Sequence, residues 1–125
     1  MQIRGKASTR ILGSLEEDEA AAFLKDKGCS ILGRNYSCKA GEIDVIYSDS
    51  EGVICFGEVK FRTEMVHGLP EEAVNNAKQR KICRASDYYR AKFSLDESMS
   101  YRYDVIAISD DGIKWIKNAF EYIER

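Results

Sequence analysis

The chain of 125 residues contains one proline, one histidine and no apolar run of the ~18 residues that a membrane-spanning helix needs. Its four cysteines include no Cys-x-x-Cys pair, so neither a zinc cluster nor a disulfide framework is indicated. The N-terminal residues lack the apolar stretch of a secretory signal. These absences predict a cytoplasmic protein without a membrane segment and, at this length, a single domain over residues 1–125.

An excess of positive charge is also missing, because 19 Lys and Arg residues face 21 Asp and Glu residues and the net charge is −2. Strong non-specific binding of nucleic acids depends on Lys and Arg neutralising phosphates, so the overall charge does not predict it. A local basic rim is still possible. Its candidates, each of which a solvated helix face explains equally well, are Arg62, Lys78, Arg80, Lys81 and Arg84.

The sequence does contain a strand-like segment that is interrupted by charge. Residues 53–61 read Val-Ile-Cys-Phe-Gly-Glu-Val-Lys-Phe, with apolar groups on both faces, as in a strand covered from both sides. Burying the carboxylate of Glu58 costs several kcal/mol unless it meets a partner, a metal ion or water. A hairpin before this segment would place Asp44 opposite Glu58, and the two-residue period puts Glu42 beside Asp44.

This charged cluster has two interpretations. A cross-strand ladder of ion pairs on a solvated face would contribute ~0.2–1 kcal/mol per pair. Alternatively, Asp44 and Glu58 bind Mg²⁺ or Mn²⁺, and the backbone carbonyl of Val59 supplies a third oxygen ligand. Lys60 would then orient a water and offset the charge that develops on a phosphate. The second interpretation predicts the hydrolysis of phosphodiesters.

The same residues resemble the active-site pattern of the PD-(D/E)XK nuclease superfamily. Gly-Glu-Ile-Asp over 41–44, followed by Glu-Val-Lys over 58–60, is specifically similar to the YraN family of small bacterial proteins. Members of that family resemble Holliday-junction resolvases. The resemblance implies an α/β fold with a restriction-endonuclease-like or resolvase-like core, in which helices flank a mixed central sheet of about five strands.

The resemblance also implies roles for single residues. Asp44 and Glu58 would be metal ligands, Lys60 the catalytic lysine, and Glu17 an acid that reaches the metal directly or through water. Lys78 matches a lysine of the family pattern, which makes it the best candidate for a phosphate contact. Glu42 is assigned a supporting role.

The function implied is a Mg²⁺- or Mn²⁺-dependent endodeoxyribonuclease that acts on branched or structured DNA in repair or recombination. Because four-way junctions have two-fold symmetry, a resolvase-like enzyme is expected to act as a homodimer. A protein partner that supplies positive charge is a further expectation. The alternative is a non-catalytic module that keeps the nuclease fold and binds nucleic acid or protein.

Asp104 interrupts a second apolar strand, with Arg102 two residues away on the same face. A buried Arg–Asp pair that fixes the strand register is favoured over a catalytic role. Periodicity, capping and turn signals predict helices and strands along the whole chain. The helices are expected over 14–27 and 70–92, and the strands over 29–36, 39–48, 52–62, 101–109 and 113–116.

Overall fold

The computed structural model describes residues 6–61 and 74–125, with side chains from residue 15 onward within these ranges. Arg62 and Pro70, the expected start of the second helix, therefore lie outside the described residues. None of the described helices is long and apolar enough to cross a membrane. The described elements are, in chain order, α1 (Lys6–Asp26), β1 (Ser30–Cys38), β2 (Gly41–Ser48), β3 (Ile54–Phe61), α2 (Asn76–Lys92), β4 (Tyr101–Ser109) and β5 (Gly112–Phe120).

The described strands form one five-stranded sheet in the order β1-β2-β3-β4-β5. Strands β3 and β4 are parallel, and the other three neighbouring pairs are antiparallel. Parallel neighbours need a long crossover, and α2 lies in the chain segment that joins β3 to β4. The mixed sheet of five strands with flanking helices, which the sequence predicts, is confirmed.

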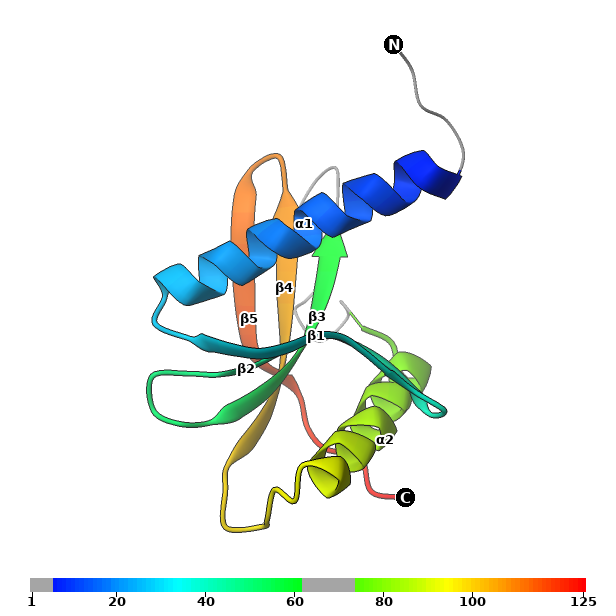
Figure 1. The fold of residues 1–125 in the computed structure, drawn as a ribbon, viewed down its shortest axis with the longest axis vertical. Coiled ribbons are helices and arrows are strands. Elements are labelled where there is room, and N and C mark those ends of the chain that lie inside the picture. The colour runs from blue at the N-terminus through cyan, green and yellow to red at the C-terminus, as the bar shows by residue number, and fades with distance from the viewer. Residues whose placement is uncertain (1–5, 62–73) are drawn as a thin grey trace.

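Both faces of the sheet are covered, which explains the nearly continuous apolar sequences of β3 and β4. Ala20 and Leu24 of α1 pack with Tyr47 and other buried side chains of one face. Ile82 and Tyr89 of α2 belong to the core of the other face. Figure 1 shows α1 crossing the strands in the upper half of the view, with α2 below it.

Helix boundaries differ from the expected ones. The first helix begins at Lys6 and not near residue 14, because the Gly-Ser pair over 13–14, a typical start signal, is tolerated inside the helix. The second begins at Asn76, because the side chain of Asn75 accepts a hydrogen bond from the Lys78 N–H at 2.9 Å and caps the helix. Residues 74 and 75 are not helical, so a helix that runs unbroken from residue 70 is wrong.

The predicted pair between Arg102 and Asp104 is present and belongs to a buried network. Asp104 is fully buried and receives two hydrogen bonds from the Arg102 guanidinium, at 2.8 and 2.9 Å. It also accepts from the Tyr47 hydroxyl, from Trp115 Nε1 at 3.1 Å and from the Asn118 N–H at 2.8 Å. Asn118 has a positive φ of 54° inside β5, where the register with β4 shifts. The network thus joins β2, β4 and β5 on the α1 side of the sheet.

Candidate functional site

The hairpin of β2 and β3 brings Asp44 close to Glu58. The two strands pair from Ser48–Ile54 to Val45–Gly57, and Asp44 and Glu58 come next in this register. The Val59 N–H donates to Asp44 Oδ2 at 2.8 Å, which fixes the carboxylate against the end of β3. The expected juxtaposition of the two acids across neighbouring antiparallel strands is therefore present.

The loop of this hairpin is held by Asp49. Its Oδ1 accepts hydrogen bonds from the N–H groups of Glu51 and Val53, at 2.9 and 3.0 Å. Its Oδ2 forms an ion pair with Arg102 at 3.1 Å. Because a slip of one residue would turn every side chain to the opposite face, a fixed turn is what keeps Asp44 and Glu58 together.

Gly57, directly before Glu58, was not singled out from the sequence. A Cβ atom at this position would lie 2.9 Å from Val45 Cγ1 and 3.0 Å from Ile106 Cδ1, so a larger residue would push the neighbouring strands away. The available signal was an isolated glycine inside an apolar strand, which often marks a close approach. Gly57 allows the packing of β2, β3 and β4 beside the acids.

Within the described residues, the two carboxylates take part in one ion pair, that of Glu58 with Lys78. Glu58 is 7% exposed, and its Oε2 lies 3.5 Å from the ammonium of Lys78. Burial and, next, the nearby Glu58 charge raise the pKa of Asp44 from 3.8 to about 6, against the lowering effects of the Val59 N–H and the Lys78 charge. Oxygen donors with an unneutralised negative charge suit Mg²⁺ or Mn²⁺, which take one or two protein carboxylates and keep several waters. The residues present therefore fit such an ion.

Asp44→Asn is expected to stabilise the metal-free protein at pH 7.5 by roughly 1–2 kcal/mol, allowing for solvent screening. The folded protein holds the Asp44 proton more tightly than the unfolded chain does, because its pKa is raised. Stability from this group is therefore lost as the pH rises from about 4 to about 6. Asparagine removes the charge and keeps an acceptor for the Val59 N–H. Urea unfolding with chelator at pH 7.5 and pH 4 measures the gain, which should disappear at pH 4; a variant less stable than wild type at pH 7.5 would contradict it.

Glu17 approaches this region from α1. It is partly buried, and its pKa is raised by burial and by the charges of Asp44 and Glu42, while a hydrogen bond with Asn35 and the Arg34 charge lower it. Within residues 6–61 and 74–125, no three His, Cys, Asp or Glu side chains come close enough together to hold a metal ion. Glu17 therefore does not complete a three-carboxylate cage with Asp44 and Glu58, and its action through water stays a prediction.

Lys60 and the Val59 carbonyl also remain predictions. Lys60 lies two residues after Glu58 on β3, so the alternation of the strand places both side chains on the same face. It is partly buried. Glu42, at the start of β2, is exposed and lies two residues before Asp44, which agrees with a supporting position at the rim of the site.

The expected basic residues occupy different surroundings. Lys78 lies at the carboxylates, and Arg80 and Lys81 are exposed on α2. Arg84 was expected to contact nucleic acid, but its guanidinium donates to the Ile123 carbonyl, lies over the Tyr122 ring and pairs with Asp87 at 3.1 Å. Arg84 thus holds the C-terminal segment against α2, and its contact with nucleic acid stays a prediction.

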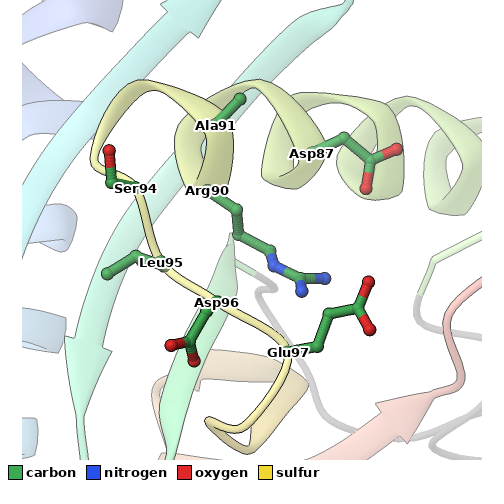
Figure 2. A pocket seen from close by; sticks show the side chains of 7 residues that line it. All are labelled: Asp87, Arg90, Ala91, Ser94, Leu95, Asp96 and Glu97. Carbon is green, nitrogen blue, oxygen red and sulfur yellow. The ribbon is translucent and has the colours of Figure 1, made fainter.

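A hollow of about 570 Å³ lies at the far end of α2, away from the carboxylates. Figure 2 shows Arg90 extending into it between Asp87 and Glu97. The Arg90 guanidinium also lies 3.9 Å from the centroid of the Tyr101 ring. This hollow brings together none of the predicted catalytic residues, so the candidate site is the carboxylate pair that the β2–β3 hairpin brings together.

Comparison with known proteins shows the family to which the chain belongs. The model of the uncharacterised protein family UPF0102 matches residues 16–108, which include Glu17, Asp44, Glu58 and Lys60. The chain belongs to UPF0102. This is the family named YraN above, so the membership predicted from the sequence is confirmed.

Curated UPF0102 proteins resemble the chain over nearly its whole length. One from Lachnoclostridium phytofermentans is 42% identical over 112 residues, which cover 90% of this chain and 94% of the relative. One from Janthinobacterium sp. (strain Marseille) is 34% identical over 119 residues, covering 95% and 94%. The crystal structure of a repair endonuclease from Pyrococcus abyssi is similar with a TM-score of 0.40 and 15% identity. That match covers 87% of this chain but 41% of the endonuclease, so the chain spans less than half of that protein.

Proposed function

We propose that this member of UPF0102 is a Mg²⁺- or Mn²⁺-dependent endonuclease that hydrolyses phosphodiester bonds in branched or otherwise structured DNA. The observation that carries the proposal is the pair of Asp44 and Glu58, two desolvated carboxylates from adjacent strands, with the Lys78 ammonium 3.5 Å from Glu58. When bound, the metal ion would polarise the scissile phosphate and lower the pKa of a water.

The chain's own residues divide the remaining work. Asp44 and Glu58 hold the ion together with the Val59 carbonyl, and the Val59 N–H orients Asp44. The ammonium of Lys60 donates to the water and to the phosphate oxygens, where negative charge develops. Glu17 supports a water on the α1 side. Lys78, Arg80 and Lys81 on α2 bind neighbouring phosphates.

The preferred DNA and the assembly follow from symmetry and charge. A four-way junction presents two equivalent strands, so a homodimer with one site per protomer would cut both. The net charge of −2 does not favour non-specific binding along a uniform duplex, so the proposed substrate would be bound at a local basic surface. The proposed cleavage of branched DNA would serve DNA repair or recombination.

Cleavage of a matched substrate panel tests the proposal. Wild type is incubated with Mg²⁺ or Mn²⁺ and fluorescent versions of a four-way junction, a flap and a linear duplex of equal length. We expect metal-dependent cleavage of a branched substrate, reduced at least 100-fold by Glu58→Gln, because a ligand is lost. Glu51→Gln, which neutralises an exposed acid of the hairpin loop, is the control and should cleave like wild type.

Two outcomes of this assay would contradict the proposal. One is cleavage that Glu58→Gln leaves unchanged, which would trace the activity to a contaminant or to another site. The other is binding of branched DNA without cleavage and without any dependence on metal. The second result would favour the non-catalytic binding module, with which the overall acidic charge is also compatible.

A further inference from the structure

The ion pair between Lys78 and Glu58 is unequal in its burial. The Glu58 side chain is 8% exposed, whereas the Lys78 side chain is 46% exposed and reaches the carboxylate from the first turn of α2, with Nζ 3.5 Å from Oε2. The backbone of Lys78 is fixed, because its N–H donates to the Asn75 cap at 2.9 Å. A half-exposed ammonium on a flexible stem can therefore leave Glu58 without disturbing the helix.

We propose that Lys78 is an internal counter-ion that a divalent cation displaces from Glu58, so that metal binding frees its ammonium for a phosphate of the nucleic acid. The inference rests on the proposed function, since it needs both ligands. A cation that coordinates Glu58 repels the ammonium and replaces the charge that it supplied. The Lys78 side chain is half-exposed, so its ammonium regains water when it leaves Glu58, and the exchange opposes metal binding only weakly.

The exchange couples the two ligands. In the metal-free protein Lys78 neutralises Glu58 and is partly withheld from phosphates. With metal bound, it stands at the edge of the site as a free positive charge. Coupling of binding free energies is reciprocal, so nucleic acid tightens metal binding by the same factor by which metal tightens nucleic-acid binding. Among the described residues of α2, neither Arg80 nor Lys81 is paired with Glu58, so neither is expected to show this coupling.

Metal titration of Lys78→Met is the first test. Methionine keeps the length and apolar character of the stem and removes the charge that competes with the cation. We expect Mn²⁺ to bind about 3- to 10-fold more tightly to this variant than to wild type, measured by calorimetry without DNA. Lys78→Arg should restore the wild-type affinity. Lys81→Met, three residues along the same helix, removes an equal charge that does not touch Glu58 and should change the affinity less than twofold.

Binding of a branched DNA is the second test, and here Lys78→Met should lose affinity relative to wild type when a divalent cation is present. With Ca²⁺, which also prefers oxygen ligands, wild-type affinity should rise and its dependence on salt should steepen by about one phosphate contact, a slope of ~0.9. Lys78→Met should lack both changes and match wild type when chelator replaces Ca²⁺. Thermal unfolding of each variant confirms that it is folded.

The possible negative results distinguish the counter-ion role of Lys78 from the metal site itself. If Mn²⁺ binds wild type but binds Lys78→Met equally or more weakly, the counter-ion role is wrong while the metal site stands. If Lys78→Met weakens DNA binding equally with and without Ca²⁺, Lys78 is a phosphate contact that is not gated by metal. If wild type binds no divalent cation, the proposed function itself fails.

Discussion

Lys60→Met is expected to slow the cleavage of branched DNA by about 10²–10⁴-fold while the variant still folds and binds metal. In the proposed site Lys60 provides the positive charge that faces the attacking water and the phosphate, and no metal ligand is lost when it is replaced. Single-turnover cleavage at saturating Mg²⁺ isolates the chemical step, and Mn²⁺ calorimetry on the same sample shows that Asp44 and Glu58 still bind the ion.

Lys92→Met is the matched control for this loss. Lys92 lies at the exposed C-terminal end of α2, with its ammonium over the Phe93 ring. The substitution removes the same charge as Lys60→Met and should leave the rate within twofold of wild type. A Lys60→Met enzyme that keeps its full rate would show that Lys60 takes no part in catalysis. A variant that has also lost metal binding would instead make Lys60 a structural support of the carboxylates.

Arg102→Leu is expected to destabilise the protein by about 3–5 kcal/mol, because it leaves the fully buried Asp104 without its counter-charge. For a chain of this size the corresponding fall in melting temperature is about 10–20 °C. The Arg102–Asp104 pair matters to the site because Asp104 lies opposite Gly57 in the register of β3 with β4, and Gly57 directly precedes Glu58. Thermal and urea unfolding at pH 7.5 measure the loss.

A second Arg–Asp pair in the protein provides the comparison. Arg34 and Asp18 lie 2.6 Å apart, but their side chains are 34% and 58% exposed. Arg34→Leu should therefore cost at most about 1 kcal/mol, because water replaces the lost partner. Equal losses in the two variants would contradict the view that burial, and not the short distance, makes the Arg102 pair important. An Arg102→Leu protein as stable as wild type would do the same.

The arrangement of the catalytic candidates could be predicted because it is local. A five-residue loop joins β2 to β3, so counting outward from the turn sets Asp44 against Glu58, and the apolar residues around Glu58 marked it as buried. This inference needs only the two-residue period of strands and the reach of a tight turn. The mixed sheet, with its crossover between β3 and β4, was expected only from the resemblance to the nuclease superfamily.

What could not be predicted depends on contacts between residues far apart in the chain. The Arg84 guanidinium contacts the Ile123 carbonyl and the Tyr122 ring, which belong to the C-terminal segment. Asn118 adopts a positive φ because its N–H must reach Asp104 across a shifted register. The isolated glycine at position 57 signals a close approach in general, but the side chains that require it lie on two neighbouring strands. Local patterns carry no information on such partners.

Calorimetric titration of Mn²⁺ into wild type and Asp44→Asn at pH 7.5 tests whether Asp44 and Glu58 form a divalent-metal site. We predict one binding event per chain in wild type and at least a 30-fold weaker one in Asp44→Asn, even though that variant is the more stable protein without metal. Binding of equal strength in both, or none in either, would show that the two carboxylates do not form such a site.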